Sequence, residues 1–184
     1  MKQYYFSVWG NGGFPITGTG VTDGGIPAGA VECTETQYKN PGSYSIDTSN
    51  MTVVSAPVAA QLLAAQTTQK ALVTQSCVTA MTGGFVSSAL GSSHTYPSTL
   101  TDQHNLSGSV VASLLPNLPS GWTTSFWCMD STGAWAFTPH MAAQIQQVGM
   151  DGKAWITAQQ EKLASLNAQI EVATTVSEVT AIIW

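Results

Sequence analysis

The chain has 184 residues, and its 5 Lys and Arg against 10 Asp and Glu give a net charge of −5 at pH 7. All the cations are lysines, and charged residues make up only 8% of the chain. Because phosphate binding needs clustered positive charge and guanine readout usually uses arginine, nucleic acid is not expected as a partner. No apolar run approaches the roughly 20 residues of a membrane span, so no membrane insertion is expected. The length suits one domain of ordinary size, or one domain with a small appendage.

The N-terminal part of the chain predicts strands and turns. Tyr4, Phe6 and Val8 alternate with Tyr5, Ser7 and Trp9, which is typical of a strand with one or both faces covered. The turn sequence at 11–13, Asn-Gly-Gly, is typical of a hairpin. The glycine-rich stretch 18–29 is expected to break any regular element. Residues 30–33 then predict a short return strand.

Residues 34–81 predict two helices separated by a second irregular strand pair. Thr34 and Gln37 have the spacing of a capping box, which predicts one helical turn. The strand pair is expected over 43–54. From Val58 to Met81 nothing breaks a helix. This helix, rich in alanine, glutamine and threonine, can pack on its own domain or line up with copies of itself.

The C-terminal part predicts helices and a short antiparallel sheet. Strand-like runs over 85–90 and 94–96 are followed by a helix that Thr101 caps and Pro116 ends. Residues 126–137 have the clearest hairpin pattern in the chain. Pro139 is expected at the first position of a helix that meets Gly149 and Gly152 before it resumes.

Two shorter predictions complete the C-terminal part. The apolar positions from Ile156 to Ala173 step by three and four, which predicts a seam for one partner helix. Thr175 and Glu178 have the spacing of a second capping box, which opens a short final helix.

Three histidines and a carboxylate form the first constellation that could carry chemistry. His94, Asp102, His104 and His140 are enough to ligate a transition metal, or to build a hydrolytic triad with a serine. Neither an HExxH nor a GxSxG pattern is present, so no serine is nominated. The plainer interpretation, which we prefer, is that His94 and His140 bond backbone carbonyls near strand and helix ends.

The tryptophans and cysteines form the second set of candidates. Trp127 and Trp135 flank the predicted turn. Such residues more often form core, but on a rim they stack sugar rings or fill a partner's pocket. Cys33, Cys77 and Cys128 lack CxxC spacing, so we expect three buried free thiols and no metal or other cofactor.

Several phrases of the C-terminal half, beginning with TGGFVSSALGSSHTYP at 82–97, resemble a known family. The others are 100–103, 105–106, 126–128, 133–135, 139–149, 152–153, 173–176, 178–179 and 181–184. Over roughly 80–184 the chain resembles the uncharacterised C-terminal domain found in bacteriophage and prophage tail-fibre-region proteins. The resemblance implies no catalytic residues. It marks six polar motif positions that we expect to form a buried network holding helix to hairpin: His94, Asp102, Gln103, Asn105, His140 and Gln144.

A second resemblance lies in the first forty residues. Residues 4–7, the Gly-Gly-Phe turn at 12–14, and 26–35 with Tyr38 are similar to the opening of phage tail fibre assembly proteins. Those proteins bind the distal end of the fibre, help it trimerise and in some phages remain as a cap. The C-terminus differs, since it lacks the tryptophan-lysine-lysine helix typical of the best-known assembly family. An assembly factor and a fibre component both stay open.

Taken together, the sequence predicts an α+β protein in three parts. These are a β-rich module at 1–54, a linking helix at 55–82 and a domain of helices on a short antiparallel sheet at 83–184. We expect a non-enzymatic tail protein, located in the virion tail, that binds a tail fibre or baseplate protein. The alternatives are a receptor-binding or structural fibre or baseplate subunit, oligomeric and most simply trimeric, that contacts a host glycan or protein, and a metal-dependent hydrolase using the three histidines.

Overall fold

The structure is a computed structural model that describes residues 2–7, 16 and 18–184. It contains two compact units. The N-terminal unit comprises Met1–Ala71 with Ala168–Ile183, and the C-terminal unit comprises Leu72–Asn167 with Trp184. The predicted α+β class is confirmed. The predicted three-part organisation stays a prediction, and the hairpin turn expected at 11–13 lies outside the described residues.

The N-terminal unit contains an antiparallel sheet with strand order β2-β1-β3. The strands are β1 (Gln3–Ser7), β2 (Gly18–Thr22) and β3 (Ala30–Cys33). The predicted return strand is therefore confirmed. One face of the sheet contributes to a small core whose buried members are Phe6, Val31, Cys33 and Ile46.

The expectation that residues 18–29 form no regular element is wrong for Gly18–Thr22, which pairs along the whole length of β1. The ring of Tyr5 lies directly over Gly20, in the space that a Cβ at that position would occupy. An aromatic ring over a strand glycine supplies the cover that the missing side chain cannot. This cross-strand contact explains why so glycine-rich a segment forms a strand.

The rest of the N-terminal unit agrees closely with prediction. Its further elements are α1 (Glu35–Lys39), η1 (Pro41–Ser43), β4 (Tyr44–Asp47) and β5 (Thr52–Ser55). The Thr34–Gln37 capping box is present at the start of α1. β4 and β5 form an antiparallel hairpin, which confirms the second strand pair.

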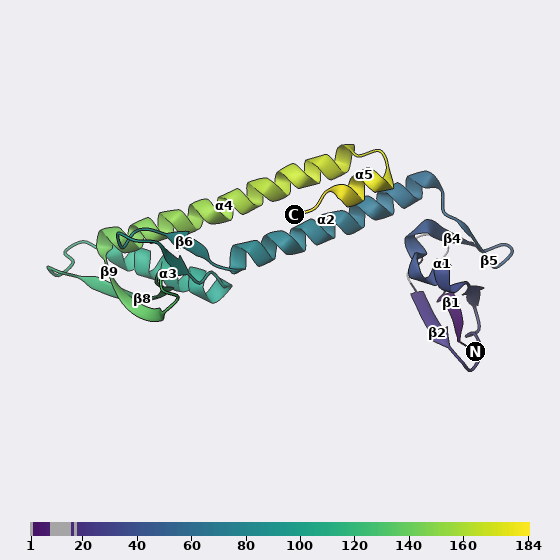
Figure 1. Ribbon diagram of the computed structural model, residues 1–184, viewed down its shortest axis with the longest axis horizontal. Coiled ribbons are helices and arrows are strands. Elements are labelled where there is room, and N and C mark those ends of the chain that lie inside the picture. The colour runs from purple at the N-terminus through teal and green to yellow at the C-terminus, as the bar shows by residue number, and fades with distance from the viewer. Residues whose placement is uncertain (1, 8–15, 17) are drawn as a thin grey trace. The chain divides into compact units, whose positions relative to one another are not determined.

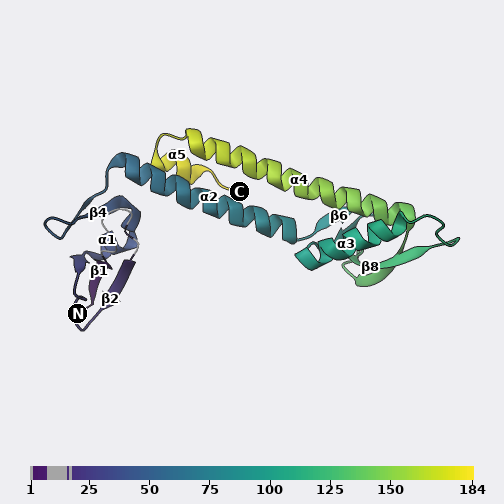
Figure 2. The same cartoon turned by 180° about the vertical axis from the view of Figure 1, so that it is seen from behind.

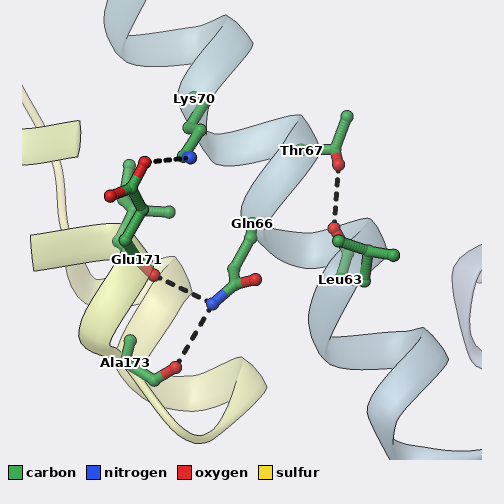
Figure 3. Close-up of polar contacts among 7 residues, drawn as sticks. Leu63, Gln66, Thr67, Lys70, Glu171 and Ala173 are labelled. Atoms are coloured by element: carbon green, nitrogen blue, oxygen red, sulfur yellow. Dashed lines mark hydrogen bonds and ion pairs between the residues drawn. The ribbon is translucent and has the colours of Figure 1, made fainter. Parts of the chain in front are cut away.

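The helix predicted over 58–81 is confirmed as α2 (Val58–Thr82), and two further helices meet it, α4 (Ala142–Val172) and α5 (Val176–Ala181). In the N-terminal unit, Gln66 Nε2 donates to the carbonyl oxygens of Ile170, at 3.0 Å, and of Ala173, at 3.3 Å (Figure 3). Lys70 Nζ lies 2.8 Å from Glu171 Oε1. The two Gln66 bonds satisfy the carbonyls of Ile170, in the last turn of α4, and of Ala173, directly after it.

The C-terminal unit is built on an antiparallel sheet with strand order β6-β7-β8-β9. The strands are β6 (Phe85–Ser87), β7 (His94–Tyr96), β8 (Thr123–Met129) and β9 (Trp135–Met141), and α3 (Leu100–Ser113) lies beside β8 (Figure 1 and Figure 2). The predicted hairpin is confirmed and is longer than expected. The core between sheet and helices comprises Phe85, Tyr96, Leu106, Phe126, Cys128, Ile145 and Val148.

The predicted start of the helix over 101–115 is wrong by two residues. Thr99, and not Thr101, is the N-cap of α3: its side chain accepts from the backbone N–H of Asp102. The Asp102 carboxylate accepts in return from the Thr99 N–H, at 3.0 Å. An aspartate three residues after the cap completes this reciprocal pair, so it selects the earlier threonine.

The expectation that Pro139 opens a helix is also wrong, because Pro139 lies within β9 and α4 begins at Ala142. β9 is the edge strand of the sheet, where a residue without an N–H is tolerated. α4 also runs without a break through Gly149 and Gly152. A Cβ at Gly152 would lie 2.9 Å from Phe85 Cζ, so this glycine lets the helix approach the core closely.

In the C-terminal unit, α2 runs antiparallel beside α4, which confirms the predicted seam (Figure 1 and Figure 2). Trp155 Nε1 donates to the Ala80 carbonyl at 3.2 Å, and the thiol of Cys77 lies 3.6 Å from the Gln159 carbonyl. All the cysteines are buried free thiols, as predicted. Burial raises the pKa of Cys77 above its ordinary value.

Across the described part of the chain, no helix has the length and apolar character that crossing a membrane requires.

Candidate functional site

The outer face of the β8–β9 hairpin carries an unusual set of exposed apolar side chains. In the antiparallel register, Trp127 lies opposite Phe137 and Met129 lies opposite Trp135. Directly opposed residues point to the same side of a sheet, and residues two apart along a strand share a face. The outer face therefore carries Thr123 and Ser125 together with six apolar residues, which we call the aromatic face: Trp127, Met129, Trp135, Phe137, Pro139 and Met141.

The three aromatic rings of this face pack on one another and not into the core. The rings of Trp127 and Trp135 are stacked with centroids 6.0 Å apart and 14° between their planes. Phe137 lies 4.9 Å from Trp127 in a tilted arrangement. Trp127 is 39% exposed, Trp135 is 42% exposed and Phe137 is 69% exposed. The preferred interpretation of the two tryptophans as core residues is therefore wrong.

The turn between the strands fixes the register of this face. Asp130 Oδ1 accepts from the Thr132 hydroxyl, at 2.7 Å, and from the backbone N–H groups of Thr132, at 2.8 Å, and Ala134, at 3.1 Å. These bonds, with that of the Thr132 hydroxyl as the largest cause, hold the pKa of Asp130 below its usual value. Gly133 has a φ of 88°, which favours glycine. A rigid turn of this kind keeps the rings of the two strands stacked in one arrangement.

The inner face of the same hairpin holds a buried histidine. His140 Nδ1 lies 2.8 Å from the Thr138 carbonyl, and Nε2 lies 2.9 Å from the Tyr96 hydroxyl. Because a carbonyl only accepts, Nδ1 donates, and in a neutral ring Nε2 accepts from Tyr96. Burial, and to a lesser extent the nearby His94, lowers the pKa of His140. The side chain thus serves as a neutral hydrogen-bonding member of the core.

The other predicted polar positions make separate local bonds. His94 Nδ1 lies 3.0 Å from the Ser92 carbonyl, and Gln103 Nε2 donates to the Ser98 carbonyl at 2.9 Å. Gln144 Oε1 accepts from the Met141 N–H at 2.8 Å. Asp102 caps α3 as described above, and Asn105 lies exposed on α3 beside His104.

The structure does not join these residues into one network. Within the described residues, no hydrogen bond connects any two of His94, Asp102, Gln103, Asn105, His140 and Gln144. His94, Asp102, Gln103, His140 and Gln144 instead bond the backbone of their own segments, and His140 also bonds Tyr96. In the part of the chain that the structure describes, no group of three His, Cys, Asp or Glu side chains is placed to hold a metal ion. His94, His104 and His140 are not brought together.

Phe137 and Met141 are members of the aromatic face that the sequence analysis did not single out. A signal for them is present in the sequence, since apolar residues occupy both faces of 126–129 and every outer position of 135–141. A strand with one face in water normally alternates between apolar and polar side chains. A hairpin that is apolar on both sides therefore has one apolar face more than its own core requires.

Comparison with known proteins gives one assignment. No curated protein matches the chain, and no solved structure matches it. The model of a family described as a domain of unknown function, DUF4376, matches residues 64–183. The match begins inside α2, earlier than the start near residue 80 expected from the sequence. The chain belongs to the DUF4376 family.

Proposed function

We propose that this chain is a non-enzymatic bacteriophage tail protein that binds the tail fibre, either as an assembly factor or as a cap retained at the fibre tip. The phage context rests on the phrases of residues 80–184 that are similar to tail-fibre-region proteins, and on the opening residues that are similar to fibre assembly proteins. The protein would be made in the bacterial cytoplasm and act at the virion tail.

The single observation that supports a binding role is the aromatic face. Exposed clusters of tryptophan, phenylalanine and methionine are enriched in the centres of protein–protein interfaces. Contiguous apolar patches are uncommon on monomeric soluble proteins, and they mark interaction sites. Trp127, Trp135 and Phe137 form such a cluster on a rigid hairpin, so little conformational entropy is lost when a partner covers it.

Co-expression with the fibre chain tests the proposal. We expect a stoichiometric complex with the fibre chain encoded directly upstream, isolated by affinity purification and sized by light scattering. The double variant Trp135→Thr and Phe137→Thr keeps β-forming residues but removes two rings, and it should weaken the complex at least about tenfold. Val86→Thr removes an apolar side chain that is 59% exposed on β6, and it should leave binding intact.

Two results would contradict this proposal. Absence of any complex between the wild-type chain and the fibre would remove the fibre as partner. Equal loss of binding in the double variant and in Val86→Thr would show that the aromatic face is not the specific contact. Mass spectrometry of purified tails then separates the two roles, since a retained cap has a fixed copy number per tail and a departing assembly factor is absent.

A receptor-binding or structural fibre or baseplate subunit is the second candidate, and the stacked tryptophans favour it specifically. Aromatic faces of this kind also stack on the apolar faces of sugar rings. In that role the isolated protein would bind the host cell surface without the fibre chain. Binding of the purified protein to host cells, lost in the Trp135→Thr and Phe137→Thr variant, would favour this candidate over the first.

A further inference from the structure

The edge of β8 that faces away from β9 is largely open. β9 pairs with all of β8, from Thr123 to Met129, but β7 pairs with it only at Thr95, opposite Met129. Two positions further along that register, Pro97 would lie opposite Trp127. Proline has no N–H to donate and ends the ladder there. The chain then turns into α3, so no strand of the described chain covers β8 beyond Met129.

The turn shows which backbone groups lie on this open edge. The Asp130 N–H donates to the Ala134 carbonyl at 3.0 Å, and hydrogen-bonded pairs alternate along an antiparallel ladder. Phe126 and Cys128 therefore exchange bonds with β9, whereas Ser125 and Trp127 direct their N–H and C=O groups to the other edge. The proline at position 139, opposite Ser125, fits this pattern because a non-bonded position needs no donor.

These outward groups have no partner in the described structure. Among residues 2–7, 16 and 18–184, no backbone bond outside the regular helices and strands reaches Ser125 or Trp127. Unpaired groups at alternate residues of a strand are a template for pairing with another chain. The two residues present four such groups, two donors and two acceptors.

A groove of about 780 Å³ lies along this edge, between β8 and α3. Small residues of α3 form part of its wall, including Gly108, Ser109 and Ala112. A Cβ at Gly108 would meet nothing within 4 Å, so this part of the groove is open. Trp127 and Phe137 of the aromatic face line the groove as well. The groove therefore joins an open strand edge to exposed aromatic rings.

We propose that this groove binds an extended segment of a partner protein, which adds to the sheet as a strand on the open edge of β8. The segment's backbone would bond Ser125 and Trp127, and its alternate side chains would contact either the small residues of α3 or the rings of Trp127 and Phe137. The lining includes the carboxylate of Asp102 and no lysine. A neutral or basic segment is therefore favoured over an acidic one.

A strand fits these observations better than a saccharide does. A sugar would be held mainly by side-chain hydroxyl, amide and carboxylate groups around an aromatic ring. The distinguishing feature here is a repeat of unpaired N–H and C=O groups at residues i and i+2, which is the spacing that an antiparallel strand matches. Ser109 and Asn105 also line the groove, so binding of a sugar is retained as an outcome of the test.

The inference rests on the proposed function only in assuming that the chain is a binding protein. The groove is therefore tested with peptides and not with the fibre chain. Strand binding without fibre association would overturn the identity of the partner and leave the groove in place. Fibre association that is unaffected by blocking the groove would leave the fibre as partner and overturn the groove as its binding site.

The probes are blocked seven-residue peptides in which threonine alternates with one apolar residue (valine, leucine, phenylalanine or tryptophan), with a lysine at each end. We expect at least one to bind saturably, measured by fluorescence of the tryptophans. Amide hydrogen exchange should slow at Ser125 and Trp127, which exchange fast in the free protein, and remain unchanged at Phe126. N-methylation of alternate residues on the bonding edge of the peptide should abolish binding, whereas methylation on the other edge should not.

Two variants of one residue provide the matched comparison in the protein. Ser125→Pro removes the outward N–H at a position that does not donate to β9, and should weaken peptide binding roughly fivefold to tenfold. Ser125→Ala keeps this N–H and should bind as the wild type does. Gly108→Leu fills the groove from α3 and should also block binding. If Ser125→Pro fails to fold, the methylated peptides still test the proposal on the wild-type protein.

The proposal is overturned if none of the peptides binds, or if both sets of methylated peptides bind equally well. Binding of a trisaccharide of N-acetylglucosamine in the groove, with Ser125 and Trp127 amides still exchanging freely, would replace the strand by a sugar as the occupant.

Discussion

The sheets of the two units are both small and antiparallel, and each packs one face on its own core, but their outer faces differ. The outer face of the N-terminal sheet carries Gln3, Ser7 and Glu32, and Gln3 Nε2 donates to Glu32 Oε1 at 3.5 Å. Among the described residues of this face the one aromatic side chain is Tyr5, which covers Gly20. The outer face of the β8–β9 hairpin carries Trp127, Trp135 and Phe137 instead.

The fold of the C-terminal unit does not by itself explain the exposed apolar face of the hairpin. A polar outer face is what a sheet against water requires, and the N-terminal sheet has one. The β8–β9 hairpin buries Phe126 and Cys128 as a normal inner face, yet keeps a second apolar face exposed. We infer that the second face is retained for a partner.

The largest change in stability is expected when the inner face of the hairpin is altered, compared with the outer face. Phe126→Ala should lower the free energy of unfolding by about 3–5 kcal/mol, because Phe126 is buried in the core. Phe137→Ala should lower it by about 1 kcal/mol or less, because that ring is 69% exposed and loses only a cross-strand contact. Urea unfolding followed by near-ultraviolet circular dichroism measures both. Similar losses in the two variants would mean that the aromatic face is part of the folding core.

A smaller effect is expected where α4 closes over the inner face. Gly152→Ala places a methyl group 2.9 Å from the ring of Phe85, which stacks on Tyr96. The strain should outweigh the gain in helix propensity and lower the unfolding free energy by about 1–2 kcal/mol. Thermal unfolding checks this expectation. An unchanged or raised melting temperature would show that the Phe85 ring moves aside freely.

The inner face should also respond to pH through His140. Burial holds the pKa of this side chain below its ordinary value of 6.5, so the unfolded chain binds a proton before the folded chain does. The unfolding free energy should therefore be highest above about pH 6.5 and fall as the pH drops below it, towards the pKa in the folded state. Urea unfolding at about pH 7.5 and about pH 5.5 measures this fall.

The exposed His104 supplies the control for the pH experiment. The fall in stability should persist in His104→Gln and be reduced in His140→Gln, which also loses the bond to Tyr96. The interval avoids the carboxylates, since those with shifted pKa values have them lowered from the ordinary values of 3.8 for Asp and 4.5 for Glu. Equal stability of the wild type at the two pH values would contradict a buried neutral His140.

The smallest effect is a gain in stability. Gly108→Ala adds a methyl group on the groove side of α3, where nothing lies within 4 Å, and should raise the unfolding free energy by up to about 1 kcal/mol. Thermal unfolding of this variant beside Gly152→Ala compares a helical glycine in open space with one in the core. A loss of stability in Gly108→Ala would indicate that the groove is closed in solution.

Elements that depend on neighbours in sequence could be predicted well. The capping boxes at Thr34 and Thr175, the uninterrupted helix of residues 58–82 and the turn after Met129 are all present in the structure. In each, the hydrogen bonds that define the element join residues only a few positions apart. A single sequence contains those spacings in full.

Elements that depend on packing against distant segments could not be predicted from the sequence. A proline followed by a helix-forming run predicts the start of a helix, but pairing with β8 keeps Pro139 in a strand. Gly149 and Gly152 predict a break in the helix, but Val110 and Phe85 pack against α4 at those positions. The bonds of the predicted network residues depend on packing in the same way, since spacing cannot show which polar groups bond local backbone.

The sequence by itself determined the class of the protein, its principal helices and the position of its hairpin. Only the tertiary structure decided which side of the hairpin is core, because apolar side chains lie on both sides of β8 and α3 and α4 can cover just one of them. It also decided that β8 keeps an open edge, since this follows from where Pro97 falls in the register between β7 and β8. Register and coverage are relations between segments distant in sequence, and no local pattern contains them.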